Sequence, residues 1–231
     1  MIFLVTLYSF AILGAAAPDS GIACVADRAT RLALREVKDA SVKSGATWTC
    51  ALGRGDSIRV TVRVLQAHDE NAAHESLSLR RVGVAFPFQT LPVDVGWGFA
   101  VLAKRGKGMS AIDLDGDGFR DLLIESQRGR GSNRAASVFL YDARTSTLVP
   151  VRALSTLMNV RPSTQGCIRH SMSDPPGPMD FVEGEYCTED FEWVETSRVE
   201  TTRNESTGRR IRRHYVRRRS AMVLARTDTL R

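Results

Sequence analysis

Alternating apolar and polar residues recur along the chain at the period of two that is typical of β-strands. In residues 57–64, polar side chains alternate with Ile58, Val60, Val62 and Val64. This pattern, preceded by a glycine-containing turn, predicts a strand that buries one face and belongs to a hairpin. Residues 77–88 predict another strand, whose apolar face would carry Val82, Val84, Phe86 and Phe88.

Short strands separated by turn signals continue through the second half of the chain. Residues 136–141 and 147–151 predict a hairpin around residues 142–146, and residues 154–158 fit one short helical turn. Residues 27–43 fit neither the strand period nor the helix period, so their structure stays open. The pattern as a whole predicts an all-β fold built from antiparallel sheets.

Four carboxylates interrupt this pattern within nine residues, between two apolar runs: Asp113, Asp115, Asp117 and Asp121. Two carboxylates about 5 Å apart repel by roughly 0.8 kcal/mol in water and by about 3 kcal/mol at an effective dielectric near 20. A cation would remove this repulsion. Four carboxylates, with the Phe119 carbonyl between the third and the fourth, offer oxygen ligands only, which suits Ca²⁺ better than Mg²⁺.

The helix-loop-helix calcium hand opens with the same D-x-D-x-D-G pattern. It ends, however, with a bidentate Glu at the twelfth position, where this chain has Ile124. The short apolar run after Asp121 instead favours a strand-loop-strand, in which Gly116 and Gly118 supply the tight bends. A solvated acidic turn without an ion is the alternative, although ordinary turns need only one or two Asp residues.

This loop carries a resemblance to a known family. Residues 98–101 followed by residues 113–124 resemble the FG-GAP or VCBS type of calcium-loop blade, a unit of β-propellers. Residues 138–142 and 154–159, with Glu185, Tyr186 and Trp193, resemble a narrower group of small exported bacterial proteins with a single calcium loop. Some of these act as inhibitors or immunity proteins against lysozyme-like cell-wall hydrolases. The resemblance implies a propeller-like arrangement, complete or incomplete, and a β-sandwich is the other arrangement that the strand pattern allows.

The N-terminus has the pattern of an export signal. Residues 2–13 are apolar but too few to span a bilayer, and a small-x-small cleavage site ends at Ala16, although no Lys or Arg precedes the apolar run. We therefore expect a signal peptide at residues 1–16, a single all-β domain at residues 17–231, and a periplasmic or secreted product. An uncut anchor and a lipoprotein modified at Cys24 are the alternatives, and membrane association is expected only with that lipid.

All four cysteines lie beyond the predicted cleavage site: Cys24, Cys50, Cys167 and Cys187. An exported chain with an even number of cysteines normally oxidises them, which predicts two disulfides. Three pairings are possible. We favour Cys24–Cys50 with Cys167–Cys187 because each bond closes a local loop.

An acidic, Thr-rich segment at residues 195–205 precedes a basic one at residues 209–219, and a turn separates them. The pattern predicts a hairpin in which opposite charges face each other. The seven arginines of the basic segment account for the net charge, since without them it would fall from +6 to −1. An exported protein meets little nucleic acid, so an acidic protein or an anionic envelope surface is the expected partner. The alternative is a solvent-exposed hairpin that has no binding role. The candidate binding residues are Arg209, Arg210, Arg212, Arg213, Tyr215 and Arg217.

Catalytic signatures are absent from the sequence, which has no G-x-S-x-G elbow, H-E-x-x-H helix, Walker loop or Rossmann fingerprint. We therefore expect a binding module rather than an enzyme. The resemblance implies an inhibitor or immunity protein whose partner is a peptidoglycan hydrolase. The alternatives are a structural or adhesion protein of the envelope, and a glycosidase-like enzyme that uses the carboxylates of residues 183–192.

Overall fold

The computed structural model describes most of the chain beyond the predicted signal peptide. The described residues are 21–36, 46–53, 56–66, 73–93, 102–103, 107–127, 133–164, 166–173, 179–189 and 192–230. The predicted signal peptide and residues 98–101 of the family resemblance lie outside this part of the chain. Within it, no helix is both long enough and apolar enough to cross a membrane.

Five strands form an antiparallel sheet that we call the N-terminal sheet, in the order β2-β3-β4-β5-β6. They are β2 (Val25–Ala26), β3 (Thr47–Leu52), β4 (Asp56–Gln66), β5 (Ala73–Arg81) and β6 (Gln89–Val93). The predicted alternation is confirmed where side chains are described, because Ile58 and Val60 are both buried. Residues 27–43, whose structure the sequence left open, include the helix α1 (Arg28–Glu36). Its first turn is capped by Asp27, whose Oδ1 accepts a hydrogen bond from the Thr30 N–H at 2.7 Å.

The strand predicted over residues 77–88 is wrong in its second half. β5 ends at Arg81, and the chain turns there, with Val84 N–H donating to the Arg81 carbonyl at 3.1 Å. Gly83 has a φ of +88°, a left-handed conformation that glycine adopts easily and that a strand cannot contain. The apolar side chains predicted to be buried in a strand are therefore exposed on a connection between β5 and β6.

Another five strands form the central sheet, in the order β1-β7-β8-β9-β10. They are β1 (Ile22–Ala23), β7 (Met109–Ile112), β8 (Asp121–Gln127), β9 (Arg134–Asp142) and β10 (Thr147–Pro150). β9 and β10 are the hairpin predicted around residues 142–146, and they are paired from Asp142 opposite Thr147. β1 comes from the start of the described chain and pairs with β7, so the N-terminal segment closes one edge of this sheet.

The C-terminal sheet is a six-stranded antiparallel meander, in the order β11-β12-β13-β14-β15-β16. Its strands are β11 (Arg161–Pro162), β12 (Cys167–Ser173), β13 (Met179–Glu189), β14 (Glu192–Arg203), β15 (Arg210–Arg218) and β16 (Ala221–Leu230). The predicted acidic-to-basic hairpin is β14 and β15, and β16 continues it. The short helical turn is a 3-10 turn, η1 (Arg152–Leu154), which lies slightly earlier than predicted.

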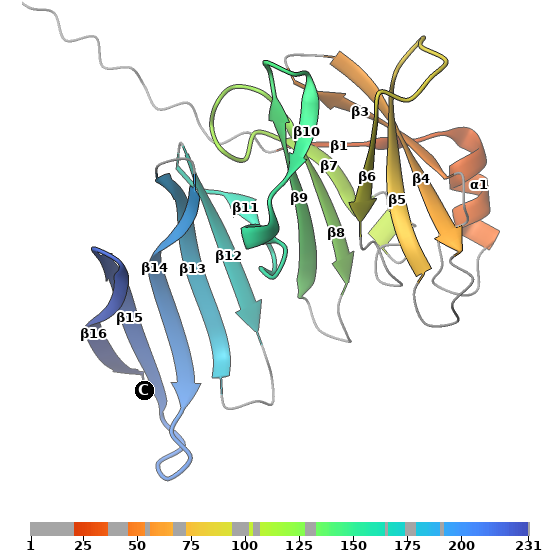
Figure 1. The fold of residues 1–231 in the computed structure, drawn as a ribbon. Coiled ribbons are helices and arrows are strands. Elements are labelled where there is room, and N and C mark those ends of the chain that lie inside the picture. Colours follow the sequence, from red (N-terminus) through yellow and green to blue (C-terminus); the bar gives the residue numbers. More distant parts are fainter. Residues whose placement is uncertain are drawn as a thin grey trace, which may run out of the picture.

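The three sheets lie side by side, with the central sheet between the other two (Figure 1). Alternate residues of β8 point to opposite sides of the central sheet: Leu122 and Ile124 enter the cluster shared with the N-terminal sheet, and Leu123 enters the cluster that contains Ile168 of the C-terminal sheet. The central sheet thus buries both of its faces at this point, which is why three successive residues of β8, Leu122, Leu123 and Ile124, are apolar and buried. The all-β, antiparallel prediction is confirmed. Neighbouring sheets bury apolar clusters between them, which fits the sandwich-like arrangement.

Candidate metal centre and binding surface

The predicted calcium loop connects β7 to β8 in the central sheet, so it is a strand-loop-strand. Backbone amides inside the loop hold its first carboxylate: the N–H groups of Gly116 and Gly118 donate to Oδ1 and Oδ2 of Asp113 at 2.7 and 3.0 Å. Both glycines have a positive φ, +75° and +85°. These bends fold the loop back on itself, so that alternate aspartates face its interior.

Three of the four predicted carboxylates come together in this loop. One oxygen each from Asp113, Asp115 and Asp117 lies within 4.8 Å of the other two. Burial, and then the charge of Asp117, raises the pKa of Asp115 to about 6. Such a donor set consists only of carboxylate oxygens and fits a hard cation of the calcium type, which would relieve the repulsion among them.

The fourth carboxylate, Asp121, has different contacts. It is buried at the start of β8, where its Oδ2 accepts from Leu114 N–H and its Oδ1 from Tyr141 N–H, both at 2.8 Å. Burial raises its pKa to about 8, against the effect of these two donors. Asp121 therefore joins the loop to β9, and the described contacts place it outside the group formed by the other three carboxylates.

Phe119, predicted to offer its carbonyl to the ion, is fixed through other groups. Its N–H donates to Asp117 Oδ1 at 2.8 Å, and its ring stacks on Tyr141 with the ring centroids 6.0 Å apart. The partly buried ring packs against the larger apolar cluster. The aromatic side chain thus anchors the second half of the loop on the central sheet.

Backbone contacts join this loop to both of the other sheets. On one side, Gly53 at the end of β3 exchanges two hydrogen bonds with Arg120, at 3.0 and 3.2 Å. On the other side, Gly166 N–H donates to the Asp115 carbonyl at 2.7 Å. The loop of residues 113–120, which belongs to the central sheet, is therefore in contact with both of the other sheets.

Both of these glycines occupy positions that other residues would strain. Gly53 has a φ of +61°, and a Cβ there would lie 3.1 Å from the Tyr141 ring. Gly166 has a φ of +74°, and a Cβ there would lie 3.3 Å from Thr188 Oγ1. Their spacing in the sequence gives no sign of a shared partner, so sequence reasoning missed them.

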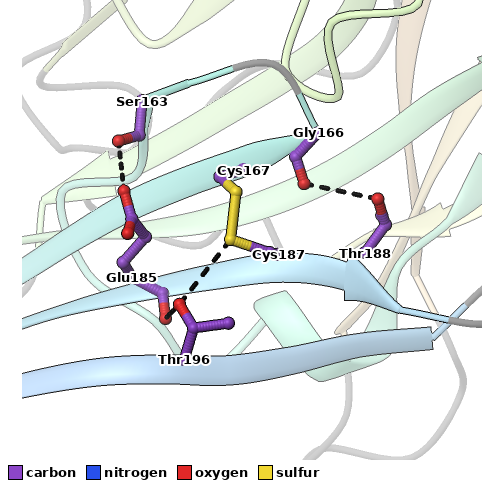
Figure 2. The surroundings of a disulfide bond; sticks show 7 residues. All are labelled: Ser163, Gly166, Cys167, Glu185, Cys187, Thr188 and Thr196. Carbon is purple, nitrogen blue, oxygen red and sulfur yellow. Dashed lines mark hydrogen bonds between the residues drawn. A yellow bond between two sulfur atoms is a disulfide. The ribbon is translucent and has the colours of Figure 1, made fainter. Parts of the chain in front are cut away.

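The two disulfides are the favoured pairs, Cys24–Cys50 and Cys167–Cys187. The second joins β12 and β13 directly beside Gly166, whose carbonyl accepts from the Thr188 hydroxyl at 3.3 Å (Figure 2) and from Thr188 N–H at 2.9 Å. This disulfide therefore fixes the strand end that contacts the calcium-type loop. The first disulfide occupies the Cys24 sulfur, which speaks against the lipoprotein alternative, because lipid attachment needs that thiol free.

The candidate arginines lie at the end of the turn and along β15, where alternation divides them between two faces. Arg209 is in the turn, Arg210 and Arg212 share one face, and the other face carries Arg213, Tyr215 and Arg217. The predicted opposition of charges is found in one pair, Arg213 opposite Glu200, whereas Arg210 faces Arg203. The prediction was therefore too simple: apart from Glu200, the residues of β14 that lie opposite β15 are Ser, Thr, Val and Arg.

On the neighbouring strand β14, the face that carries Arg213 and Tyr215 also carries a group of ion-paired side chains. Arg198, opposite Tyr215, donates from Nε to Glu195 Oε1 at 2.7 Å, which raises its pKa, and contacts Glu200 at 3.4 Å. A bulge on β14, where Thr196 is skipped between the partners of Glu185 and Tyr186, brings Glu195 and Arg198 to the same face. This face therefore presents cations of β15 next to carboxylates that already have a cationic partner.

Beneath this group, His170 is buried on β12. Its ring meets Tyr186 edge-on, with the centroids 5.6 Å apart, and Gly184 on β13 lies directly opposite it. Burial lowers the pKa of His170, although Glu195 opposes the shift. Among the described residues its buried Nε2 has no hydrogen-bond partner, so packing against Tyr186 and Gly184 holds this edge of the ring.

The acidic residues considered for glycosidase chemistry are spread along a strand. Glu183 and Glu189 are six residues apart on β13, which at about 3.3 Å per residue separates their backbones by roughly 20 Å. Glu183 pairs with Arg169 at 3.5 Å, and Glu185 accepts a hydrogen bond from Ser163 (Figure 2). The described contacts give these carboxylates structural partners and do not gather them around one pocket.

Comparisons with known proteins give one informative match. No family model matches the chain, and a search of curated proteins finds no significant match. Among solved structures, the chain is similar to a Xanthomonas type IV secretion system related protein. The TM-score is 0.50 and the identity is 17%, over 81% of this chain and 97% of that chain. At this identity the similarity shows a shared fold.

Proposed function

We propose that this chain is an exported, calcium-binding β-protein that binds another protein, and that its partner is a lysozyme-like cell-wall hydrolase, which it inhibits in the manner of an immunity protein. The observation that carries the proposal is the loop of Asp113, Asp115 and Asp117 between β7 and β8, whose sequence resembles that of the single-loop exported proteins. The solved structure of similar fold belongs to a type IV secretion system related protein, which supports the broader part of this proposal, a β-protein associated with the envelope or with secretion.

Export is supported by the cysteines. Both pairs are oxidised, and disulfides form and persist in compartments outside the reducing cytosol. With Cys24 engaged in a disulfide, the periplasmic or secreted form needs no lipid. The proposed location is therefore the periplasm or the medium.

Calcium has a structural role in this proposal. The ion would be held by Asp113, Asp115 and Asp117, with Asp121 and the Phe119 carbonyl as the further predicted ligands. It would neutralise the loop that contacts Gly53 of the N-terminal sheet and Gly166 of the C-terminal sheet. A scaffold fixed in this way loses little conformational entropy on binding, which favours affinity.

The binding surface in this proposal is the face of β15 that carries Arg213, Tyr215 and Arg217. Hydrolases of this class place catalytic carboxylates in a cleft, and an arginine-bearing, tyrosine-bearing strand is complementary to such a cleft. Arg213 and Tyr215 are only partly buried, so both can be reached from solvent. The binder assignment is favoured over catalysis because Glu183, Glu185 and Glu195 already have hydrogen-bonding or ion-pairing partners.

The experiment is inhibition of peptidoglycan clearing by lysozymes of animal, phage and secreted bacterial origin. The purified, oxidised protein should slow at least one of them in calcium, and an excess of chelator should weaken the inhibition. Purified protein that clears cell walls by itself would instead establish an enzyme. Failure against every class tested would overturn the inhibitor assignment.

Neighbouring arginines on opposite faces of β15 provide a matched pair of variants. Arg213→Gln and Arg212→Gln each remove one positive charge at adjacent positions, yet they alter different faces. Inhibition should fall in Arg213→Gln, and further with Tyr215→Ala, while Arg212→Gln retains it. Equal effects of the two arginine variants would show that only net charge matters and that this face is not the contact surface.

A further inference from the structure

The connection between β5 and β6 exposes an unusual density of large apolar side chains. Residues 82–88 contain no side chain with a hydrogen-bonding group, and the exposed fractions of the large ones are 49% for Val82, 49% for Val84, 78% for Phe86 and 37% for Phe88. Isolated exposed apolar residues are common on protein surfaces, but four within seven residues are not. We call these residues the apolar loop.

The apolar loop is an ordered projection. Phe88 N–H donates to the Leu79 carbonyl at 2.9 Å, Val84 N–H donates to the Arg81 carbonyl at 3.1 Å, and Arg80 Nη1 donates to the Ala85 carbonyl at 3.3 Å. Figure 1 shows the connection extending beyond the ends of β5 and β6. Several of its backbone groups are therefore satisfied within the loop, which lowers the cost of moving it into an apolar medium.

Two cations lie at the base of this projection. Arg80 and Arg81 end β5, and the Arg81 guanidinium lies 6.0 Å from the centroid of the Phe88 ring. No acidic residue occurs anywhere in residues 77–88. The apolar loop is thus immediately preceded by two positive charges, without a compensating carboxylate in the same stretch.

We propose that the apolar loop inserts into the boundary between headgroups and acyl chains of an anionic phospholipid bilayer, while Arg80 and Arg81 contact lipid phosphates. The charges are complementary: basic residues beside an inserted apolar segment add an electrostatic attraction to anionic lipid. Residues 82–88 offer no polar side chain that could pair with the polar groups of a protein surface, whereas acyl chains present no such groups. The inference does not rest on the inhibitor proposal.

The test is flotation of the purified, oxidised protein with vesicles that contain phosphatidylglycerol and with vesicles of phosphatidylcholine alone. The protein should float with the first, less with the second, and less as salt is raised. Val84→Ser with Phe86→Ser should lower the partition coefficient by about tenfold or more, because burying one Phe side chain alone favours transfer by about that factor. Both side chains are exposed, so the melting temperature should not change.

Leu224→Ser on β16 is the matched control, since Leu224 is 50% exposed, like Val84, but belongs to another sheet. It should leave flotation unchanged. The proposal is overturned if wild-type protein does not float with anionic vesicles, or if the double variant floats as well as wild type. A double variant that loses hydrolase inhibition while vesicles never bind would assign the loop to a protein partner instead.

Discussion

Replacing Asp121 by Asn tests how the calcium-type loop is held. Both oxygens of Asp121 accept from buried backbone amides, those of Leu114 and Tyr141. Asparagine keeps one acceptor, but its NH₂ group must then face the second amide. One N–H in the interior would be left without an acceptor.

The size of the destabilisation follows from the N–H group that loses its acceptor. A buried donor without a partner costs about 1–3 kcal/mol, so Asp121→Asn should destabilise the protein by this amount. For a chain of this size, roughly 3 °C of melting temperature corresponds to 1 kcal/mol, which gives a decrease of about 3–9 °C. Asp142→Asn is the control: Asp142 accepts from Arg144 N–H in an exposed turn, where water can replace the contact, so its melting temperature should hardly change.

Denaturant titrations in calcium and in chelator separate the two roles of Asp121. An equal loss in both media means that Asp121 only positions the loop. A larger loss in calcium means that it is also a ligand of the ion. A variant as stable as wild type in both media would refute the inference that these two amides depend on Asp121.

Three further predictions use the same measurements. Asp115→Ala should lower the melting temperature in calcium but change it little in chelator, because the carboxylate acts through the ion; equal losses would contradict this. Gly184→Ala should destabilise by about 1–3 kcal/mol, since the new Cβ would lie 2.5 Å from His170 Nε2, and His170→Ala in the same chain should recover part of the loss. Because burial lowers the pKa of His170, the unfolded chain binds the extra proton, so stability should fall as pH drops below 6.5, and His170→Gln should remove that part of the pH dependence.

Much of the fold was predictable because the strands follow local rules. Ile58 and Val60 alternate with polar residues and are buried, and the hairpin of β9 and β10 turns where the turn residues stand. The failure at residues 82–88 also has a local cause. Val82, Val84, Phe86 and Phe88 have the period of a strand, but Gly83 adopts a left-handed turn, so periodicity alone was misleading.

The sequence allowed the carboxylate ligands of the candidate site to be predicted, but not the contacts that join the loop to the other strands and sheets. Asp113, Asp115 and Asp117 are recognisable because their spacing is local, and they do gather. The contacts with Gly53 and Gly166 join residues about fifty or more positions away, and no periodicity encodes them. Asp121 illustrates the same limit, since its partner Tyr141 lies on another strand.

The faces of the basic strand were also beyond sequence reasoning. The sequence places seven arginines within residues 209–219, but only the strand register shows that Arg212 and Arg213 point to opposite sides. The same register pairs Arg213 with Glu200 and places Tyr215 opposite Arg198. Charge alone therefore predicts a basic segment, and the sheet decides which half of it can meet one partner.

Amide hydrogen exchange at Gly53 and Gly166 tests most directly whether an ion in the loop braces all three sheets. Their N–H groups donate to the Arg120 and Asp115 carbonyls, one on each side of the loop. Calcium should slow exchange at both amides together, and chelator or Asp115→Ala should accelerate both. Exchange at these two amides that is the same with and without calcium would contradict this prediction.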